Sequence, residues 1–66
     1  MINLYDLLYA TNDSAYVQIL DNESGELLLE GEASDLLDSY ATEEYEDCTV
    51  MDLYAWGGKL MVCIEV

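Results

Sequence analysis

The spacing of apolar residues predicts a helix at the start of the chain. Asn3 is a residue type that caps helix N-termini, and it directly precedes an apolar segment with helical periodicity. We therefore expect a helix over residues 4–10, with a polar turn over residues 11–14. Four residues at helical intervals are expected to face a core: Ile2, Tyr5, Leu8 and Tyr9.

Strict alternation of side chains then predicts a β-hairpin. Apolar residues alternate in the segment AYVQIL and continue after the polar sequence NESG. Residues 22–25 suit a type I turn with Gly25 in the left-handed conformation, which places strands near 15–21 and 26–32. This turn predicts two apolar cross-strand pairs: Ile19 with Leu29, and Leu20 with Leu28.

The middle of the chain predicts a second short helix. Ser34 is a suitable N-cap and Asp35 lies in the first turn, where negative charge is favoured. We expect this helix near residues 35–40. The following stretch, ATEEYED, is compatible with a helix end or with a loop.

A second hairpin closes the chain. Gly57 and Gly58 form a two-residue turn signal between CTVMDLYAW and KLMVCIEV. Pairing around this turn gives three apolar pairs: Met51 with Ile64, Leu53 with Val62, and Ala55 with Leu60.

These elements predict one α+β domain over residues 1–66, in the order α-β-β-α-β-β. The expected fold is a four-stranded antiparallel sheet, built from two hairpins, with two short helices on one face. Unless another segment covers it, the other face would carry an apolar patch of the kind that marks a protein contact or a homodimer. The members of this patch are Tyr16, Leu20, Leu28, Val50, Tyr54, Trp56 and Met61.

Charge changes this picture more than any motif. The formal net charge is −14, with 15 acidic residues against one lysine. Because 53% of the residues are hydrophobic, the acidity does not indicate a disordered chain. A nucleic-acid binder needs a basic surface, and an anionic membrane would repel this chain, so neither is an expected partner. No apolar run has transmembrane length and no leader sequence is recognised, so we expect a cytoplasmic protein.

Candidate chemistry is sparse. The chain contains no histidine, which excludes Ser-His-Asp and Cys-His arrangements. A domain with a radius of gyration of about 11 Å leaves little room for a substrate cleft. We therefore expect neither an enzyme nor a cofactor. The predicted register separates Cys48 from Cys63 by roughly 13 Å, too far for a disulfide, which favours free thiols in a reducing compartment.

The segment DNESGELLLEGE resembles the start of a calcium-binding EF-hand loop. Its glycine, Gly25, is the fifth residue of the segment, whereas the motif requires glycine at the sixth. A hairpin turn explains the same residues better, so we expect no metal site.

The remaining signal is an acidic middle segment without a basic residue. Alternate residues on a strand lie about 6.6 Å apart on one face, so carboxylates there form regularly spaced negative points. Such a surface can occupy the basic groove of a nucleic-acid-binding protein, with aromatic residues as anchors. The alternative is an interaction or homodimerising module that acts through the outer sheet face, with acidity serving solubility. The residues expected to contact a basic partner are Glu30, Glu32, Asp35, Asp38, Glu43, Glu44, Tyr45, Glu46, Asp47 and Trp56.

The opening LYDLLYA, the hairpin with Gly31, the acidic middle and the closing LMVCIEV resemble small proteins encoded by bacteriophages and mobile elements of Gram-positive bacteria. Size and charge resemble anti-CRISPR and anti-restriction proteins, many of which are acidic DNA mimics. This resemblance implies a viral inhibitor that blocks a host CRISPR or restriction nuclease, for example at the site that reads the protospacer-adjacent motif. It implies no particular functional residue.

Overall fold

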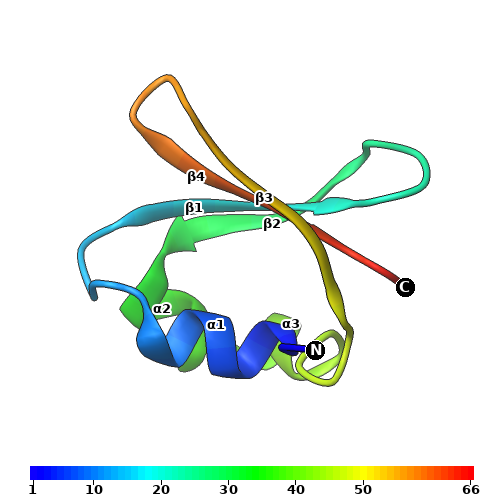
Figure 1. Cartoon of the computed structure of the whole chain (residues 1–66). Coiled ribbons are helices and arrows are strands. Elements are labelled where there is room, and N and C mark those ends of the chain that lie inside the picture. Colours follow the sequence, from blue (N-terminus) through cyan, green and yellow to red (C-terminus); the bar gives the residue numbers. More distant parts are fainter.

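The computed structural model describes residues 1–66 as three helices and four strands. Figure 1 shows all three helices on one face of a twisted sheet, while the other face is bare. The elements are α1 (Leu4–Ala10), β1 (Tyr16–Asp21), β2 (Leu27–Glu32), α2 (Ala33–Leu37), α3 (Tyr40–Glu43), β3 (Val50–Trp56) and β4 (Lys59–Ile64).

The predicted α+β class, the four strands and the two hairpins are confirmed, but the purely antiparallel sheet is wrong. The strand order is β2-β1-β4-β3, and the two hairpins join through a parallel pairing of β1 with β4. Periodicity determines the pairing within each hairpin but not which edges of the hairpins meet. The observed join puts four fully buried side chains at the centre of the sheet: Val17, Ile19, Val62 and Ile64.

The cross-strand register agrees with the sequence except at two irregularities. Leu20 lies opposite Leu27 rather than Leu28, and Val50 rather than Met51 lies opposite Ile64. A β-bulge adds one residue to one strand, and simple alternation does not reveal it. Three predicted pairs are confirmed: Ile19 with Leu29, Leu53 with Val62, and Ala55 with Leu60.

Helix α1 begins where the sequence places it. Asn3 Oδ1 accepts a hydrogen bond of 2.8 Å from the backbone N–H of Asp6, which satisfies one of the free donors of the first turn. The face that this helix buries differs from the prediction, because Leu4 and Leu8 point into the core. The core prediction is therefore confirmed for Leu8 and wrong for Ile2, Tyr5 and Tyr9, which are exposed.

The predicted helix near residues 35–40 is two helices. Helix α2 already begins at Ala33, so Ser34 lies inside it rather than at its cap. The chain turns at Asp38 and Ser39, and Ser39 Oγ accepts a hydrogen bond of 3.2 Å from the N–H of Ala41 to start α3. The first part of ATEEYED is therefore helical.

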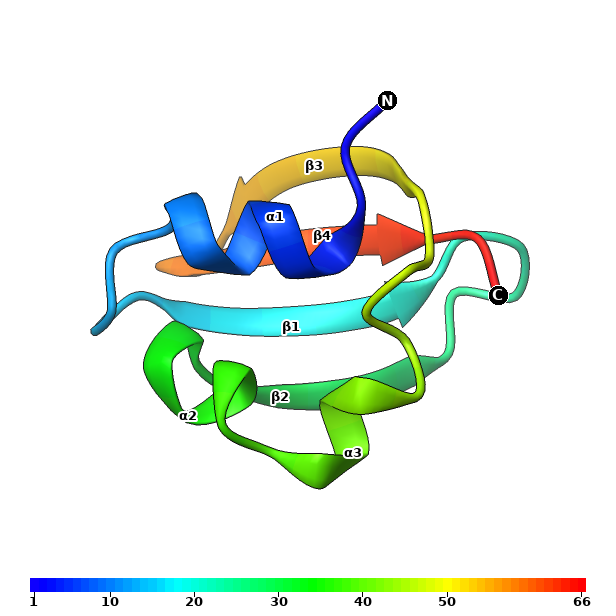
Figure 2. The ribbon, with the colours of Figure 1, turned by 90° about the horizontal axis from the view of Figure 1, so that it is seen from below.

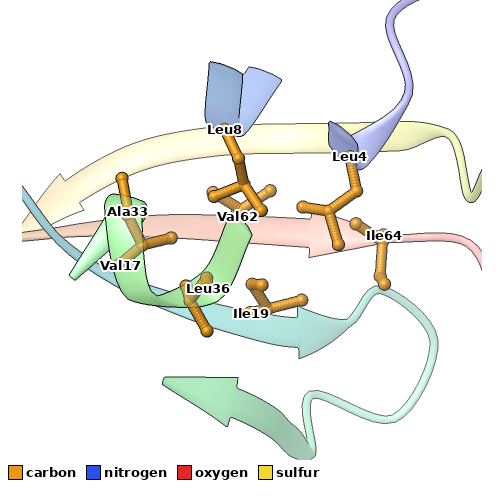
Figure 3. Packing of buried hydrophobic residues seen from close by; sticks show 8 residues of the cluster. All are labelled: Leu4, Leu8, Val17, Ile19, Ala33, Leu36, Val62 and Ile64. Carbon is orange, nitrogen blue, oxygen red and sulfur yellow. The ribbon is translucent and has the colours of Figure 1, made fainter. Parts of the chain in front are cut away.

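The core joins α1 and α2 to the two central strands. Figure 3 shows side chains from these four elements converging between the helices and the sheet. Strand β3 contributes no buried residue, and from Met51 to Trp56 every residue is exposed. The cluster comprises Leu4, Leu8, Val17, Ile19, Ala33, Leu36, Val62 and Ile64.

Candidate protein-binding surface

More than half of the acidic side chains gather at one edge of the molecule. Figure 2 shows β2, α2 and α3 together on one side, with β3 at the opposite edge of the sheet. These elements carry four carboxylates, Asp38 lies between α2 and α3, and the segment after α3 adds three more. We call this set the acidic edge: Glu30, Glu32, Asp35, Asp38, Glu43, Glu44, Glu46 and Asp47.

The acidic edge begins on the outer face of β2. Glu30 lies opposite Gln18 and Glu32 lies opposite Tyr16, whereas the intervening Val17 is buried beneath the helices. Because successive side chains of a strand alternate, both glutamates point away from the helix layer. The other members of the edge lie on the helix side of the sheet, and the last of them reach the start of α1, so the negative charge extends from β2 onto the helix face.

Backbone hydrogen bonds hold the acidic segment after α3 in place. The N–H of Tyr5 donates to the carbonyl of Glu46 at 3.1 Å, and the N–H of Leu4 donates to that of Cys48 at 2.9 Å. These are first-turn donors of α1 that have no partner within the helix. The carboxylates of this segment therefore project from a fixed backbone. Tyr45 packs partly against the core, so its ring is not a free anchor.

Glu30 is the one member of the acidic edge with side-chain hydrogen-bond partners on the sheet. Its Oε1 accepts from the Tyr16 hydroxyl at 2.7 Å and from Gln18 Nε2 at 3.3 Å. The pKa of Glu30 is lowered, first by the bond from Tyr16, then by the bond from Gln18 and by the charge of Lys59. Lys59 Nζ itself lies 5.9 Å from the centre of the Tyr16 ring. The single lysine therefore acts on the outer face and leaves the rest of the acidic edge uncompensated.

Trp56 is separated from the acidic edge. It is 66% exposed and directly precedes the β3–β4 turn. Figure 1 shows this turn and the segment after α3 at opposite ends of the molecule. The structure thus brings together the eight predicted carboxylates but not the predicted tryptophan anchor.

The outer-face patch is smaller than the sequence indicates. Leu28 and Val50 pack against the core cluster, and Met61 is only 7% exposed. The hydrogen-bonded carboxylate of Glu30 and the charge of Lys59 lie on the same face. The residues of the predicted patch that remain accessible are Tyr16, Leu20, Tyr54 and Trp56.

Asp52 makes a backbone hydrogen bond that the sequence did not predict. Its Oδ1 accepts a hydrogen bond of 2.9 Å from the backbone N–H of the next residue, Leu53. Asp52 is the only charged residue in β3, which lies at the edge of the sheet. The charge pattern does not reveal this edge position, because the central strands β1 and β4 also carry one charge each, Asp21 and Lys59.

The structure also shows one hollow and no cluster of metal-ligand side chains. No group of three or more histidine, cysteine, aspartate or glutamate side chains is arranged to hold a metal ion. A hollow of about 310 Å³ lies between the β1–β2 turn and the end of the chain, lined by Asp21, Asn22, Glu23, Glu65 and Val66. None of the three helices combines the length and the apolar composition needed to cross a membrane.

Comparison with protein-family models, curated proteins and solved structures finds no match to this chain. Function is therefore inferred from the surface itself.

Proposed function

We propose that the protein is an acidic inhibitor of the phage type. It binds the basic nucleic-acid-binding surface of a host defence nuclease, or of a similar protein, in place of DNA. The acidic edge is the contact surface. The observation that supports this proposal is the gathering of eight carboxylates on β2, α2, α3 and the segments that follow these helices, against a single lysine that acts on Glu30 at the outer face.

Electrostatics favour such a contact. Charges of one sign on a small body raise the rate at which an oppositely charged partner is captured. Grooves that bind nucleic acid are lined by lysine and arginine, which neutralise phosphates. Carboxylates held by a folded backbone offer comparable negative points without the bases. The backbone after α3 loses little conformational freedom on binding, because it is already fixed against α1.

The proposal places the protein in the cytoplasm of a host cell. Cys48 and Cys63 are both free thiols, as the predicted register requires, and free thiols persist in reducing compartments.

The first test is capture from nuclease-treated host lysate with the tagged protein, followed by elution in rising NaCl and mass spectrometry. We expect a DNA- or RNA-binding protein that elutes at moderate salt and that duplex DNA displaces in a purified competition assay. A partner that resists high salt and ignores DNA would contradict the proposal.

A pair of charge-matched variants locates the contact. The variant E43Q/E44Q/E46Q/D47N removes four charges from the acidic edge. The control D13N/E23Q/E26Q/E65Q removes the same number from exposed positions elsewhere. We expect the first variant to weaken binding by about tenfold or more and the control to weaken it much less. Equal losses would show that net charge, rather than the acidic edge, carries the affinity.

A further inference from the structure

Strand β3 exposes a backbone edge. It is the last strand of the sheet and pairs only with β4. The two-residue turn after Trp56 makes Trp56 and Lys59 the first hydrogen-bonded pair of the hairpin, and such pairs alternate along an antiparallel ladder. The backbone groups of Leu53 and Ala55 therefore point away from β4, toward the free edge.

Part of this edge is already occupied. At its start, the N–H of Val50 donates to the carbonyl of Ile2 at 3.0 Å, and Asn3 forms a bridge with Thr49. Farther along, the Asp52 carboxylate accepts from the N–H of Leu53 at 2.9 Å. The outward N–H of Ala55 and the outward carbonyls of Leu53 and Ala55 remain for a partner strand.

The side chains around this edge are apolar. Met51 and Leu53 are 44% and 47% exposed, and Tyr54 and Trp56 are 44% and 66% exposed. Tyr54 and Trp56 point to the outer face and Leu53 to the helix side, so apolar surface lies on both faces of the strand. An edge strand with little charge and without lysine or proline is a template for pairing with another chain.

We propose that β3 pairs antiparallel with β3 of a second copy of this chain, which makes a continuous eight-stranded sheet. The distribution of charge favours a second copy of this chain as the strand that pairs with β3. Glu30 and Glu32 of the acidic edge lie on β2, three strand spacings or about 14 Å from β3, whereas Glu46 and Asp47 lie beside the start of β3 and not along its free part, residues 53–55. In the dimer the two β2 strands are outermost, about 34 Å apart, which is several Debye lengths at physiological salt. A basic partner would find only Asp52 on this strand, whereas a second copy meets its least charged edge.

The dimer is symmetric and weak. A two-fold axis pairs the same residues on both copies and places all helices on one face of the extended sheet. One strand edge buries much less than the roughly 1,600 Å² of a standard interface. Pairing also requires each Asp52 carboxylate to release the N–H of Leu53. Asp52 therefore limits the affinity.

The response to salt distinguishes this dimer contact from the contact in the proposed function. Both copies are strongly negative, so screening strengthens the dimer. The same change weakens the contact between the acidic edge and a basic partner. One interaction can therefore fail while the other survives.

Analytical ultracentrifugation from about 10 µM to 1 mM, in 50 mM and 500 mM NaCl, tests the proposal. We expect a monomer–dimer equilibrium that tightens at the higher salt. The variant D52A frees the N–H of Leu53 and removes a charge beside the seam, so we expect about tenfold tighter association. A monomer at every concentration and in both salts would overturn the proposal.

The variant A55P tests the site. Proline removes the outward N–H of Ala55 without removing a bond to β4, because proline is tolerated on the free side of an edge strand. We expect A55P to abolish the dimer with an unchanged circular dichroism spectrum, and the matched control A55V to retain it. If a folded A55P dimerises as the wild type does, the free edge of β3 is not the contact and the proposal is wrong. If W56A also abolishes dimerisation while A55P does not, the contact lies on the outer face of the sheet. If A55P does not fold, methylation of the Ala55 nitrogen in a synthetic chain supplies the same test.

Discussion

The Tyr16 hydroxyl on β1 donates a hydrogen bond of 2.7 Å to Glu30 Oε1 on β2. This bond favours the neutral tyrosine and the ionised glutamate. It is the main reason why the pKa of Tyr16 is raised and the pKa of Glu30 is lowered. The bond thus attaches one carboxylate of the acidic edge to the centre of the sheet.

The pH dependence follows from these directions. The lowered pKa of Glu30 means that its contribution to stability is present above its unfolded pKa and is lost as the pH falls through its folded pKa. The raised pKa of Tyr16 means that its contribution is complete below its unfolded pKa, about 10, and is lost as the pH rises through its folded pKa. The bond therefore stabilises the fold from mildly acidic to mildly alkaline pH.

Tyr16→Phe removes this bond and leaves the ring over which Lys59 lies. We expect the pKa of Glu30 to rise toward its ordinary value, because its strongest donor is lost. Carboxyl-carbon NMR titration measures this change directly. Tyr9→Phe is the control, since Tyr9 is exposed and lies in α1, away from Glu30. An unchanged Glu30 titration in Tyr16→Phe would contradict the assigned cause.

Salt is expected to stabilise the monomer. Fourteen net negative charges on one small domain repel one another, and this repulsion opposes the compact state. Screening from 20 mM to 500 mM NaCl should raise the thermal midpoint, by about 4–8 °C for each kcal/mol of repulsion that is relieved. Circular dichroism at a protein concentration too low for dimers measures this midpoint. A midpoint that falls or stays constant would show that the carboxylates do not strain the fold.

Gly31→Ala is expected to destabilise the protein through its backbone. Gly31 has a φ of 154°, a conformation that other residues rarely adopt. Space is not the obstacle, because an added Cβ would lie 3.8 Å from the nearest atoms of Leu36, an ordinary contact. We expect a loss of about 1–3 kcal/mol in the free energy of unfolding, measured by urea titration. An unchanged free energy would mean that the strand relaxes to a common conformation.

Both thiols are expected to react slowly at neutral pH. Burial is the main reason why the pKa of Cys48 and of Cys63 is raised, and nearby carboxylates, chiefly Asp47 and Asp52 respectively, raise it further. The thiolate is the reactive form, so alkylation by iodoacetamide at pH 7.5 should be at least about threefold slower than that of glutathione. Mass spectrometry measures the rate for each cysteine. Unfolding in urea is the control and should restore an ordinary rate, whereas equal rates in the folded and unfolded chain would contradict this prediction.

The local elements of this protein follow from its sequence. Asn3 caps α1, Gly57 and Gly58 supply the left-handed turn of the second hairpin, and alternation sets the pairing of Leu53 with Val62. Each of these features depends on residues close together in the chain or joined by a short turn. Composition likewise determines the net charge and the absence of histidine.

The candidate surfaces required the tertiary structure. Only the parallel join of β1 with β4 puts the acidic β2 at one edge and β3 at the other. That join depends on which hairpin edges bury the most apolar surface together, a comparison between distant segments that periodicity does not encode. The same join leaves Leu53 and Trp56 exposed, because α1 and α2 cover the central strands and not β3. The sequence alone therefore determined that the chain is acidic and which hairpins it forms, whereas the packing of one hairpin against the other decided where the charge gathers and which strand edge stays open.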